Sequence, residues 1–492
     1  MRPVLPVLVL HNQPRADAGY AESDAGVLDE VAAVLAALAD LGIPARSAGI
    51  IALGDLPDLL AAAAEPVVFN LVEALAGPPE DVNRVPDLIL AAGKACTGNP
   101  RAALAACLDK AHAKAVLAAA GLPVPAGVVV LPGDPVPALP FAGPCIVKPA
   151  LVDASEGIHA ASAVHPGPGP GLSAAVAALH ARFGQPVLVE ALCDGLELNV
   201  AVLEEDGAPR VLAIAAIDFV DFPPELPRIV DYDAKWRADS FAFTHTTRVL
   251  PAPIDPGLAQ EVEALALAAW RAVGCRGYAR VDLRTDRAGR PVVLEVNPNP
   301  DISPDSGYAA ALAHRGRNHR ALVRAALAAA LRPPVVIRPT VATDRDPILA
   351  AITATGFFPA FEVEVAREVL DDAIAGKDDG HYRSYTALLG ERPVGWACLG
   401  PTPCTVGTWD FYWMAVHPEA QGRGIGRRLV TAVEACAREA GGRMVIIETA
   451  GRSQYDPTRA AYLACGYHEA ARIADFYADG DDKVVYVRRV DR

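Results

Sequence analysis

The chain has 492 residues, of which 52% are hydrophobic and 21% charged, and its formal net charge is −15. Because this length exceeds what one hydrophobic core normally supports, we expect three or four structural units. The acidic balance opposes non-specific binding to nucleic acid or anionic lipid, so a phosphate-bearing ligand would have to be held by a local site.

Cysteine usage and hydropathy indicate the compartment in which the protein is expected. The nine cysteines are scattered without a close C-x-x-C pair, which fits reduced thiols better than disulfides or a zinc site. The apolar runs fall short of the ~20 residues that a membrane-spanning helix needs. We therefore expect a soluble cytoplasmic protein with small-molecule partners, and neither nucleic acid nor membrane among them.

The first predicted elements alternate between buried strands and helices. An apolar strand spans residues 4–10, a helical pattern follows over 26–40, and the strand PVVFN ends at Asn70 before another helix and the turn CTGNP. Strands that alternate with helices are typical of a doubly wound α/β layer. We predict a first α/β subdomain over residues 1–105.

A second unit begins with LDKAHAKAVLAAAGLPVPAGVVV, which predicts a helix with Lys110 near its start, a stop at Gly121 and a following strand. Lys148 then ends another apolar strand, before a loop with Ser155 and Gly157. Such a loop can direct backbone N–H groups at a phosphate, beside the point charge of the lysine. Taken alone, however, the pattern is more often a surface lysine before a turn.

Polar residues further along the chain favour the phosphate-binding interpretation of Lys148, because they could line one cleft with it. They are Glu190, Glu197, Asp282, Glu295 and Asn297. Strand alternation places Arg280 and Asp282 on one face, and it does the same for Glu295 and Asn297 on the next strand. Mg²⁺ prefers oxygen ligands and commonly lies between carboxylates and nucleotide phosphates. Two neighbouring strands are therefore predicted to build a metal–nucleotide site.

In chain order, the motifs LDKAHAK, VKP…ASEGI, VLVEALCDGLELNV, DYDAKW, GYARVDL and LEVNPNPDISPDSG resemble those of the ATP-grasp superfamily, in its D-alanine–D-alanine ligase branch. The resemblance covers about residues 1–330. It implies subdomains over 1–105, 106–195 and 196–332. It also implies a ligase that uses ATP to convert a carboxylate into an acyl phosphate, which an amine then attacks.

The resemblance implies site residues at the matching positions. It assigns the ATP phosphates to Lys110, Lys148, Ser155 and Gly157. It places Glu190 at the adenine hinge and Glu197 at the ribose. Mg²⁺, or Mn²⁺ in its place, would be ligated by Asp282, Glu295 and Asn297. Lys235 would reach over the reacting phosphate from a mobile loop, and Arg280 would face the developing oxyanion.

Two departures from that family bear on the substrate. The turn PNPDISPDSG puts Asp301 where the family has a glycine, and its carboxylate either recognises a substrate ammonium or points to solvent. The segment RADAGYAESDAG lacks the glycine-rich, serine-containing pattern of the cell-wall enzymes. Glu22, Asp24 and Glu73 could bind an amino group, or they are solvated acids at helix starts. The identity of the amino-acid pair is therefore left open.

The character of the chain changes after residue 330. The segment ALAAALRPPVVIRPT ends a helix at two prolines and restarts as a strand over 335–338, which predicts a separate domain over 335–492. There, FYWMAVHPEAQGRGIGRRLVTAVEACAREAG predicts a strand, a glycine-rich turn and an amphipathic helix over 426–440. Helix N–H groups and the nearby arginines could bind a pyrophosphate, although a solvated helix face also explains these arginines.

The motifs QGRGIG, FYWMAVHP and RAAYLACGY resemble the GCN5-related N-acetyltransferase (GNAT) family over about residues 335–490. The resemblance implies acetyl-CoA as the acyl donor. It places the pyrophosphate at Gln421, Gly422, Arg423, Gly424, Gly426 and Arg427. Tyr462 would reprotonate the departing thiolate, with a packing role as the alternative, and a water-linked acid such as Asp410 or Glu448 could act as base.

The sequence thus predicts an α/β and α+β multidomain protein, with an ATP-grasp fold followed by a GNAT fold. We expect a bifunctional enzyme that joins a carboxylate to an amine and acetylates a related small amine. The alternatives are a ligase with a regulatory acetyl-CoA-binding domain, a nucleotide- and CoA-sensing protein with decayed catalysis, and acetylation of a protein amino group. The order of the two reactions is open, as is the oligomeric state, for which a homodimer is one candidate.

Overall fold

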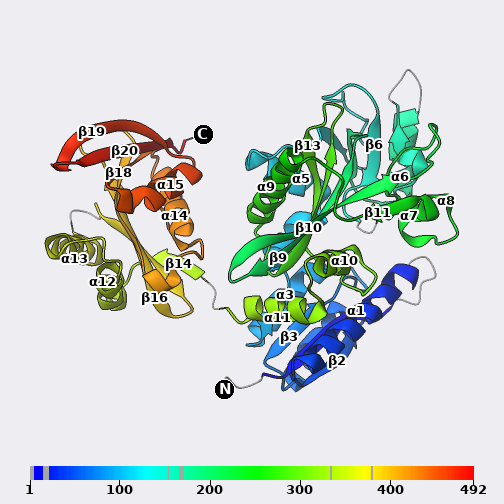
Figure 1. The fold of residues 1–492 in the computed structure, drawn as a ribbon, viewed down its shortest axis with the longest axis horizontal. Coiled ribbons are helices and arrows are strands. Elements are labelled where there is room, and N and C mark those ends of the chain that lie inside the picture. Colours follow the sequence, from blue (N-terminus) through cyan, green and yellow to red (C-terminus); the bar gives the residue numbers. More distant parts are fainter. Residues whose placement is uncertain are drawn as a thin grey trace. The chain divides into compact units, whose positions relative to one another are not determined.

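The computed structural model describes residues 5–14, 21–152, 155–165, 171–332, 335–377 and 381–491. The chain divides into two compact units, Met1–Leu331 and Arg332–Arg492 (Figure 1). Across the described ranges, no helix is both long enough and apolar enough to cross a membrane.

The first unit begins with a parallel sheet in the order β2-β1-β3-β4. Its strands are β1 (Val7–Asn12), β2 (Ala45–Ile50), β3 (Val67–Leu71) and β4 (Ala95–Cys96), and its helices are α1 (Ala21–Asp40), α2 (Leu56–Ala62) and α3 (Asp81–Ala91). Val7 and Val9 of β1 pack into one core, whereas Leu8 and Leu10 pack into another, so both faces of the sheet are covered. This double burial explains why the strand reads as a continuous apolar run.

A second sheet, in the order β5-β8-β6-β7, carries the next part of the chain. Its described pairs are antiparallel. The strands are β5 (Gly127–Val130), β6 (Cys145–Pro149), β7 (Ala163–Val164) and β8 (Val187–Ala191), and the helices of this region are α4 (Arg101–Leu108), α5 (Lys110–Ala119) and α6 (Gly171–Phe183). Val147 and Val189 pack against Val176 of α6, which leaves the opposite face of the sheet for polar side chains.

The third sheet of this unit is antiparallel, in the order β11-β10-β9-β12-β13. Its strands are β9 (Glu197–Glu205), β10 (Ala208–Phe219), β11 (Thr246–Val249), β12 (Tyr278–Thr285) and β13 (Pro291–Asn297), and its helices are α7 (Tyr232–Trp236), α8 (Phe241–His245), α9 (Pro256–Val273), α10 (Gly307–His314) and α11 (His319–Ala330). Helices α1, α10 and α11 lie close together (Figure 1). Their buried side chains share one core with those of β1 and β3, which joins this part to the first sheet.

The second unit is built on a sheet in the order β14-β15-β16-β17-β18-β20-β19. Its strands are β14 (Val335–Pro339), β15 (Arg383–Leu389), β16 (Arg392–Pro401), β17 (Thr408–Val416), β18 (Met444–Ala450), β19 (His468–Ala478) and β20 (Asp481–Arg489), and its helices are α12 (Arg345–Ala354), α13 (Ala360–Ala375), α14 (Ile425–Glu439) and α15 (Asp456–Ala464). Trp396 packs into the core of α12 and α13, whereas Ala397 packs into that of α14 and α15, so helices cover both faces.

One strand pair in this second sheet is parallel. β17 and β18 pair from Thr408 opposite Met444 to Phe411 opposite Ile447, although β17 continues to Val416 and β18 to Ala450. The two strands therefore separate beyond this register.

Candidate active sites

The cross-strand register of β12 and β13 brings four predicted site residues together. Asp282 lies opposite Glu295, and Arg280 lies opposite Asn297. The Arg280 guanidinium donates to both oxygens of Asp282, at 2.7 and 2.8 Å, and Asn199 Nδ2 donates to Asp282 Oδ1 at 2.8 Å. The predicted metal ligands and the predicted oxyanion-binding arginine therefore form one polar patch at the end of the sheet.

Glu295 lies among several cationic side chains of this patch and its surroundings. Burial opposes ionisation of its carboxyl group, but Lys110, Lys148, Lys235 and Arg280 outweigh that effect and lower its pKa to about 2. Glu295 is consequently a carboxylate at neutral pH, surrounded by cations that come from separate parts of the chain.

The donor set suits a magnesium ion that binds together with a nucleotide. Within the described parts of the chain, no group of three His, Cys, Asp or Glu residues is placed to hold a metal alone. Asp282 and Glu295 supply two carboxylates and Asn297 an amide oxygen, although Asn297 Oδ1 here accepts a hydrogen bond from Asn299 N at 2.9 Å. Mg²⁺ commonly uses one or two protein carboxylates and completes its shell with phosphate oxygens and water.

A buried ion triad lies beside this patch. The Glu190 carboxylate on β8 is 2.5 Å from Lys148 Nζ on β6 and 2.9 Å from Lys114 Nζ on α5. Lys114 Nζ also donates to the Leu294 carbonyl at 2.9 Å. Burial favours a neutral Glu190, but the two lysines outweigh it and lower the pKa of this carboxyl group. The Glu190 side chain is thus directed at lysines, and its place at an adenine hinge stays a prediction.

Lys110 and the loop that follows β6 are held by local contacts. Asp109 caps α5 by accepting from Ala111 N at 2.8 Å, and Lys110 Nζ donates to the Val152 carbonyl. Ser155 has a φ of +60° and its hydroxyl donates to the Val230 carbonyl at 3.0 Å. The predicted phosphate loop is therefore anchored at Ser155 to the segment before α7.

Gly157 occupies a position in that loop where a larger residue would not fit. Its φ is +76°, and a Cβ atom there would lie 2.7 Å from the ring of Phe183. Both the backbone angle and the close approach require glycine.

Glu197 and Lys235 complete the predicted ligands of the first unit. Burial raises the pKa of Glu197, whose carboxylate is 3.6 Å from Arg284 Nε. Burial lowers the pKa of Lys235 on α7, and the charges that act on it include Arg280 and Glu295. Lys235 therefore interacts electrostatically with the β12 and β13 patch, and its place on a mobile loop over the phosphate stays a prediction.

Acidic residues gather at Asp301, next to the patch. Glu30 on α1 is 3% exposed and its Oε1 accepts from Ile302 N at 3.1 Å. Burial, followed by the charges of Glu73 and Asp301, raises the pKa of Glu30 well above its usual value. Asp301 is exposed and accepts from Ser303 N at 2.7 Å. The side chains of Glu22 and Asp24, also predicted as amine ligands, lie outside the described residues.

The predicted pyrophosphate loop of the second unit precedes α14, which begins at Ile425 rather than at the predicted residue 426. Gly422 and Gly424 have φ values of +74° and +72°, with open space around both, so the loop turns into the helix through left-handed positions. Its predicted members Gln421, Arg423 and Arg427 are exposed, and Gly426 is half-buried. Arg428 is also exposed, but it donates to the Val335 carbonyl at 3.0 Å.

The predicted acid and base of the second unit occupy different environments. Tyr462 on α15 is 6% exposed, its ring packs near Tyr467 and Tyr486, and burial raises its pKa. Burial also raises the pKa of Asp410. Glu448 is paired with Lys483 Nζ at 2.6 Å. Asp410 is therefore the stronger candidate for the base.

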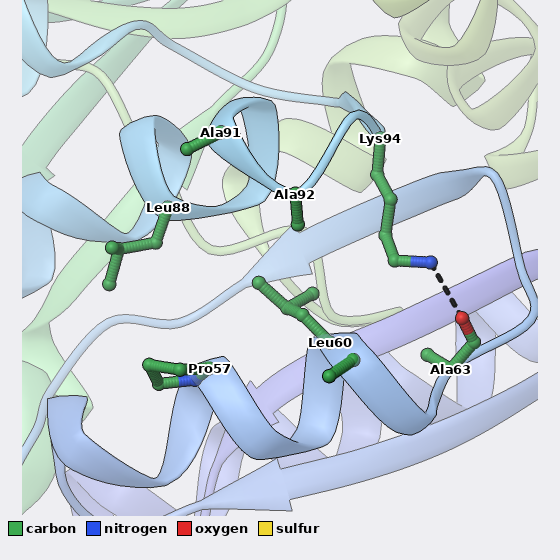
Figure 2. Close-up of a pocket in the computed structure, with 8 residues that line it drawn as sticks. Pro57, Leu60, Ala63, Leu88, Ala91, Ala92 and Lys94 are labelled. Carbon is green, nitrogen blue, oxygen red and sulfur yellow. Dashed lines mark hydrogen bonds between the residues drawn. The ribbon is translucent and has the colours of Figure 1, made fainter.

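Two of the hollows among the described residues belong to the first unit. Figure 2 shows one between α2 and α3, lined by Pro57, Leu60, Ala61, Ala63, Leu88, Ala91, Ala92 and Lys94. Lys94 Nζ donates to the carbonyls of Ala63 and Glu65, at 2.7 and 2.8 Å, so its charge is directed at the backbone. The other hollow includes Leu192, Phe222 and Arg284, and it adjoins the predicted nucleotide site because Arg284 also faces Glu197.

Sequence reasoning missed Lys114 and Arg284. The spacing of Lys110 and Lys114 could have revealed the first, because residues four apart share a helix face. Arg284 follows Asp282 by two positions on β12, so strand alternation places both on the same face. Neither pattern shows that the partners would be Glu190 and Glu197.

Comparisons with known proteins show which families the two units are similar to. A family model described as D-ala D-ala ligase C-terminus matches residues 137–328, and one described as Acetyltransferase (GNAT) family matches residues 349–467. The D-alanine–D-alanine ligase of Caulobacter sp. strain K31 is 35% identical over 276 residues, which cover 56% of this chain and 80% of that protein. An uncharacterized protein of Sinorhizobium fredii, y4sG, is 33% identical over 267 residues, covering 54% and 75%.

Solved structures extend the likeness to the fold. The D-alanine–D-alanine ligase of Bacillus anthracis, complexed with ATP, superimposes with a TM-score of 0.52 at 18% identity, covering 66% of this chain and 97% of that one. Together with the family matches, these relatives confirm the predicted ATP-grasp and GNAT folds. The chain belongs to the D-alanine–D-alanine ligase family through its first unit and carries a GNAT-family acetyltransferase domain in its second.

Proposed function

We propose that this chain is a bifunctional enzyme. Its first unit joins a carboxylate to an amine with ATP, and its second unit transfers an acetyl group from acetyl-CoA to a related small amine. The observation that carries the ligase proposal is the convergence of Arg280, Asp282, Glu295 and Asn297 at one end of β12 and β13, among cations from three other segments. Such an arrangement suits phosphoryl transfer, where positioning and charge stabilisation supply most of the catalysis.

In the ligase reaction, the substrate carboxylate attacks the γ-phosphoryl group of ATP, ADP leaves, and an acyl phosphate forms. Asp282, Glu295 and Asn297 would hold Mg²⁺, which offsets phosphate charge when bound. Lys110 and Lys148 supply further positive charge, and Lys235 covers the site from α7 so that water is kept from the acyl phosphate.

Arg280 acts in the second half of the reaction. The amine attacks the acyl carbon, a tetrahedral oxyanion forms, and phosphate departs to leave an amide bond. The Arg280 guanidinium, now paired with Asp282, has donors that can stabilise this oxyanion.

The acidic residues around Asp301 support an amino acid as a substrate. An amino acid carries an ammonium and a carboxylate, and the site offers both complements. Asp301 and Glu73 interact electrostatically with Glu30, and Arg280 and Arg248 also interact electrostatically with Asp301. In this proposal Asp301, which stands where the family resemblance leads us to expect a glycine, binds a substrate ammonium.

In the second unit, the loop from Gln421 to Arg427 would bind the pyrophosphate of acetyl-CoA, and the separation of β17 from β18 after Phe411 leaves room for the extended thioester arm. The acceptor amine loses a proton to Asp410 and attacks the acetyl carbon. Tyr462 then gives its proton to the CoA thiolate, which is consistent with a buried hydroxyl that stays protonated.

The first test is ADP release by the purified full-length protein with Mg²⁺ and ATP, across amino acids and small carboxylates, with and without acetyl-CoA. Products are identified by mass. We expect a condensed product in step with ADP, and an added acetyl mass gives the order of the reactions. Glu295→Gln should retain ATP binding but lose ADP release, and unchanged release would reject its metal role.

The same experiment separates the alternatives. ADP release that responds to acetyl-CoA without an acetylated product would favour a regulatory second unit. ATP binding without turnover on any pair would favour a nucleotide sensor over a ligase.

A further inference from the structure

Lys114 lies on α5 one helical turn beyond Lys110, outside every set of residues assigned above to ATP. We propose that Lys114 is a positioning residue for ATP binding: by neutralising Glu190, it leaves the charge of Lys148 available to a phosphate. This inference rests on the proposed ligase function, because it concerns the same nucleotide site.

The geometry places Glu190 between two lysines. Its Oε1 is 2.5 Å from Lys148 Nζ and its Oε2 is 2.9 Å from Lys114 Nζ. Glu190 is 2% exposed and each lysine is 7% exposed, so water screens these charges weakly. Each carboxylate oxygen is therefore paired with a different ammonium group.

Charge counting shows what Lys114 contributes. Two ammonium groups and one carboxylate give the triad a net charge of about +1, which suits a site that must attract phosphate. Without Lys114, the Glu190 carboxylate would have Lys148 as its sole partner in the triad, and the pair would be neutral. Lys148 would then have to leave a buried carboxylate unpaired in order to reach a phosphate, which is costly.

A simpler role for Lys114 must be distinguished from this one. Its ammonium donates to the Leu294 carbonyl, next to Glu295 on β13, so it also ties α5 to the strand of the metal site. If that bond were its whole contribution, the charge of Glu190 would be irrelevant to the effect of replacing Lys114.

The test measures the dissociation constant of MgATP by calorimetry on the full-length protein, with the unfolding temperature of each variant as a check on folding. Lys114→Gln keeps a hydrogen-bond donor but removes the charge, and it should weaken MgATP binding roughly 10- to 30-fold, as expected for one charge at this range. Adding Glu190→Gln to that variant restores the net charge of the triad. Because Glu190 is itself a predicted adenine contact, the double variant is compared with Glu190→Gln alone, and the two should bind MgATP within about threefold of each other.

Lys114→Arg, which keeps the charge, should also bind within about threefold of wild type. Lys94→Met is the matched control, since it removes a lysine that donates to backbone carbonyls away from the triad. If Lys114→Gln alone is unstable, the double variant decides, because it buries no unpaired carboxylate.

Two results would overturn the inference: Lys114→Gln with wild-type affinity, or a loss of affinity on Lys114→Gln that is as large in the Glu190→Gln background as in wild type. Wild-type protein that fails to bind MgATP would instead overturn the proposed ligase function.

Discussion

The Arg280 guanidinium donates to both carboxylate oxygens of Asp282, at 2.7 and 2.8 Å. The proposed oxyanion-binding residue is therefore paired with a proposed magnesium ligand. Both residues project from the same face of β12 and lie two positions apart. Asp282 also accepts from Asn199, which holds the carboxylate in place. Metal binding and the release of Arg280 are therefore expected to be linked through Asp282.

Asp282→Asn tests the role of Asp282 in metal binding. The substitution keeps the shape of the side chain but removes its charge, so we expect the Mg²⁺ concentration for half-maximal ADP release to rise at least tenfold. The measurement is a Mg²⁺ titration at saturating ATP. Asp286→Asn is the matched control, because Asp286 sits in the turn after β12 and pairs with Arg290 at 2.8 Å. Equal Mg²⁺ dependence in wild type and Asp282→Asn would remove Asp282 from the metal site.

Gly157→Ala tests the fit of the phosphate loop. Gly157 has a φ of +76° and its missing Cβ would meet Phe183 at 2.7 Å. We expect Gly157→Ala to lower the free energy of unfolding by about 1–3 kcal/mol and to weaken ATP binding, because the loop must shift. The measurements are denaturant unfolding and calorimetry with MgATP.

Gly133→Ala is the control for that experiment. Gly133 also has a positive φ, +91°, but open space surrounds its Cβ position. The difference between the two variants therefore isolates the contact with Phe183. Equal losses of stability would assign the whole effect to the backbone angle.

The sequence predicted the parts of the site that follow from local periodicity. Alternation along a strand placed Arg280 with Asp282, and Glu295 with Asn297, and the register of β12 and β13 then sets these pairs opposite each other. The helix expected over 26–40 begins at Ala21, since a helix can include a glycine such as Gly26 at a cost of about 1 kcal/mol.

Local periodicity does not predict contacts between segments that are distant in the sequence. Glu30 meets the backbone of Ile302, and Glu190 meets Lys114 across separate elements. Periodicity shows which face of an element a residue lies on, but not which segment packs against that face. The acidic surroundings of Asp301 and the buried triad therefore emerge only from the tertiary structure.

The protonation of Glu30 should make stability depend on pH. Burial and neighbouring carboxylates raise its pKa in the folded protein well above that of the unfolded chain. Its contribution to stability is thus complete below the unfolded pKa of about 4.3 and is lost as the pH rises through the folded value. Glu30→Gln removes this loss. The unfolding free energy of the variant, relative to that of wild type, should therefore increase progressively from pH 5 to pH 8.

The measurement is denaturant unfolding at each pH. Glu263→Gln is the control, because it removes a carboxylate from the exposed surface of α9. A constant difference between Glu30→Gln and wild type across this range would mean that Glu30 is ionised throughout.

Tyr462→Phe tests the proposed acid of the second unit. The substitution keeps the ring that packs near Tyr467 and Tyr486, so the unfolding temperature should change little. Loss of the hydroxyl should lower kcat for acetyl transfer roughly 100-fold, the usual contribution of a general acid, with a smaller change in KM for acetyl-CoA. The measurement is release of CoA thiol with the amine acceptor that product masses identify. Tyr486→Phe removes a second hydroxyl from the same aromatic group and should retain wild-type kcat. Equal kcat for Tyr462→Phe and wild type would leave Tyr462 with packing alone.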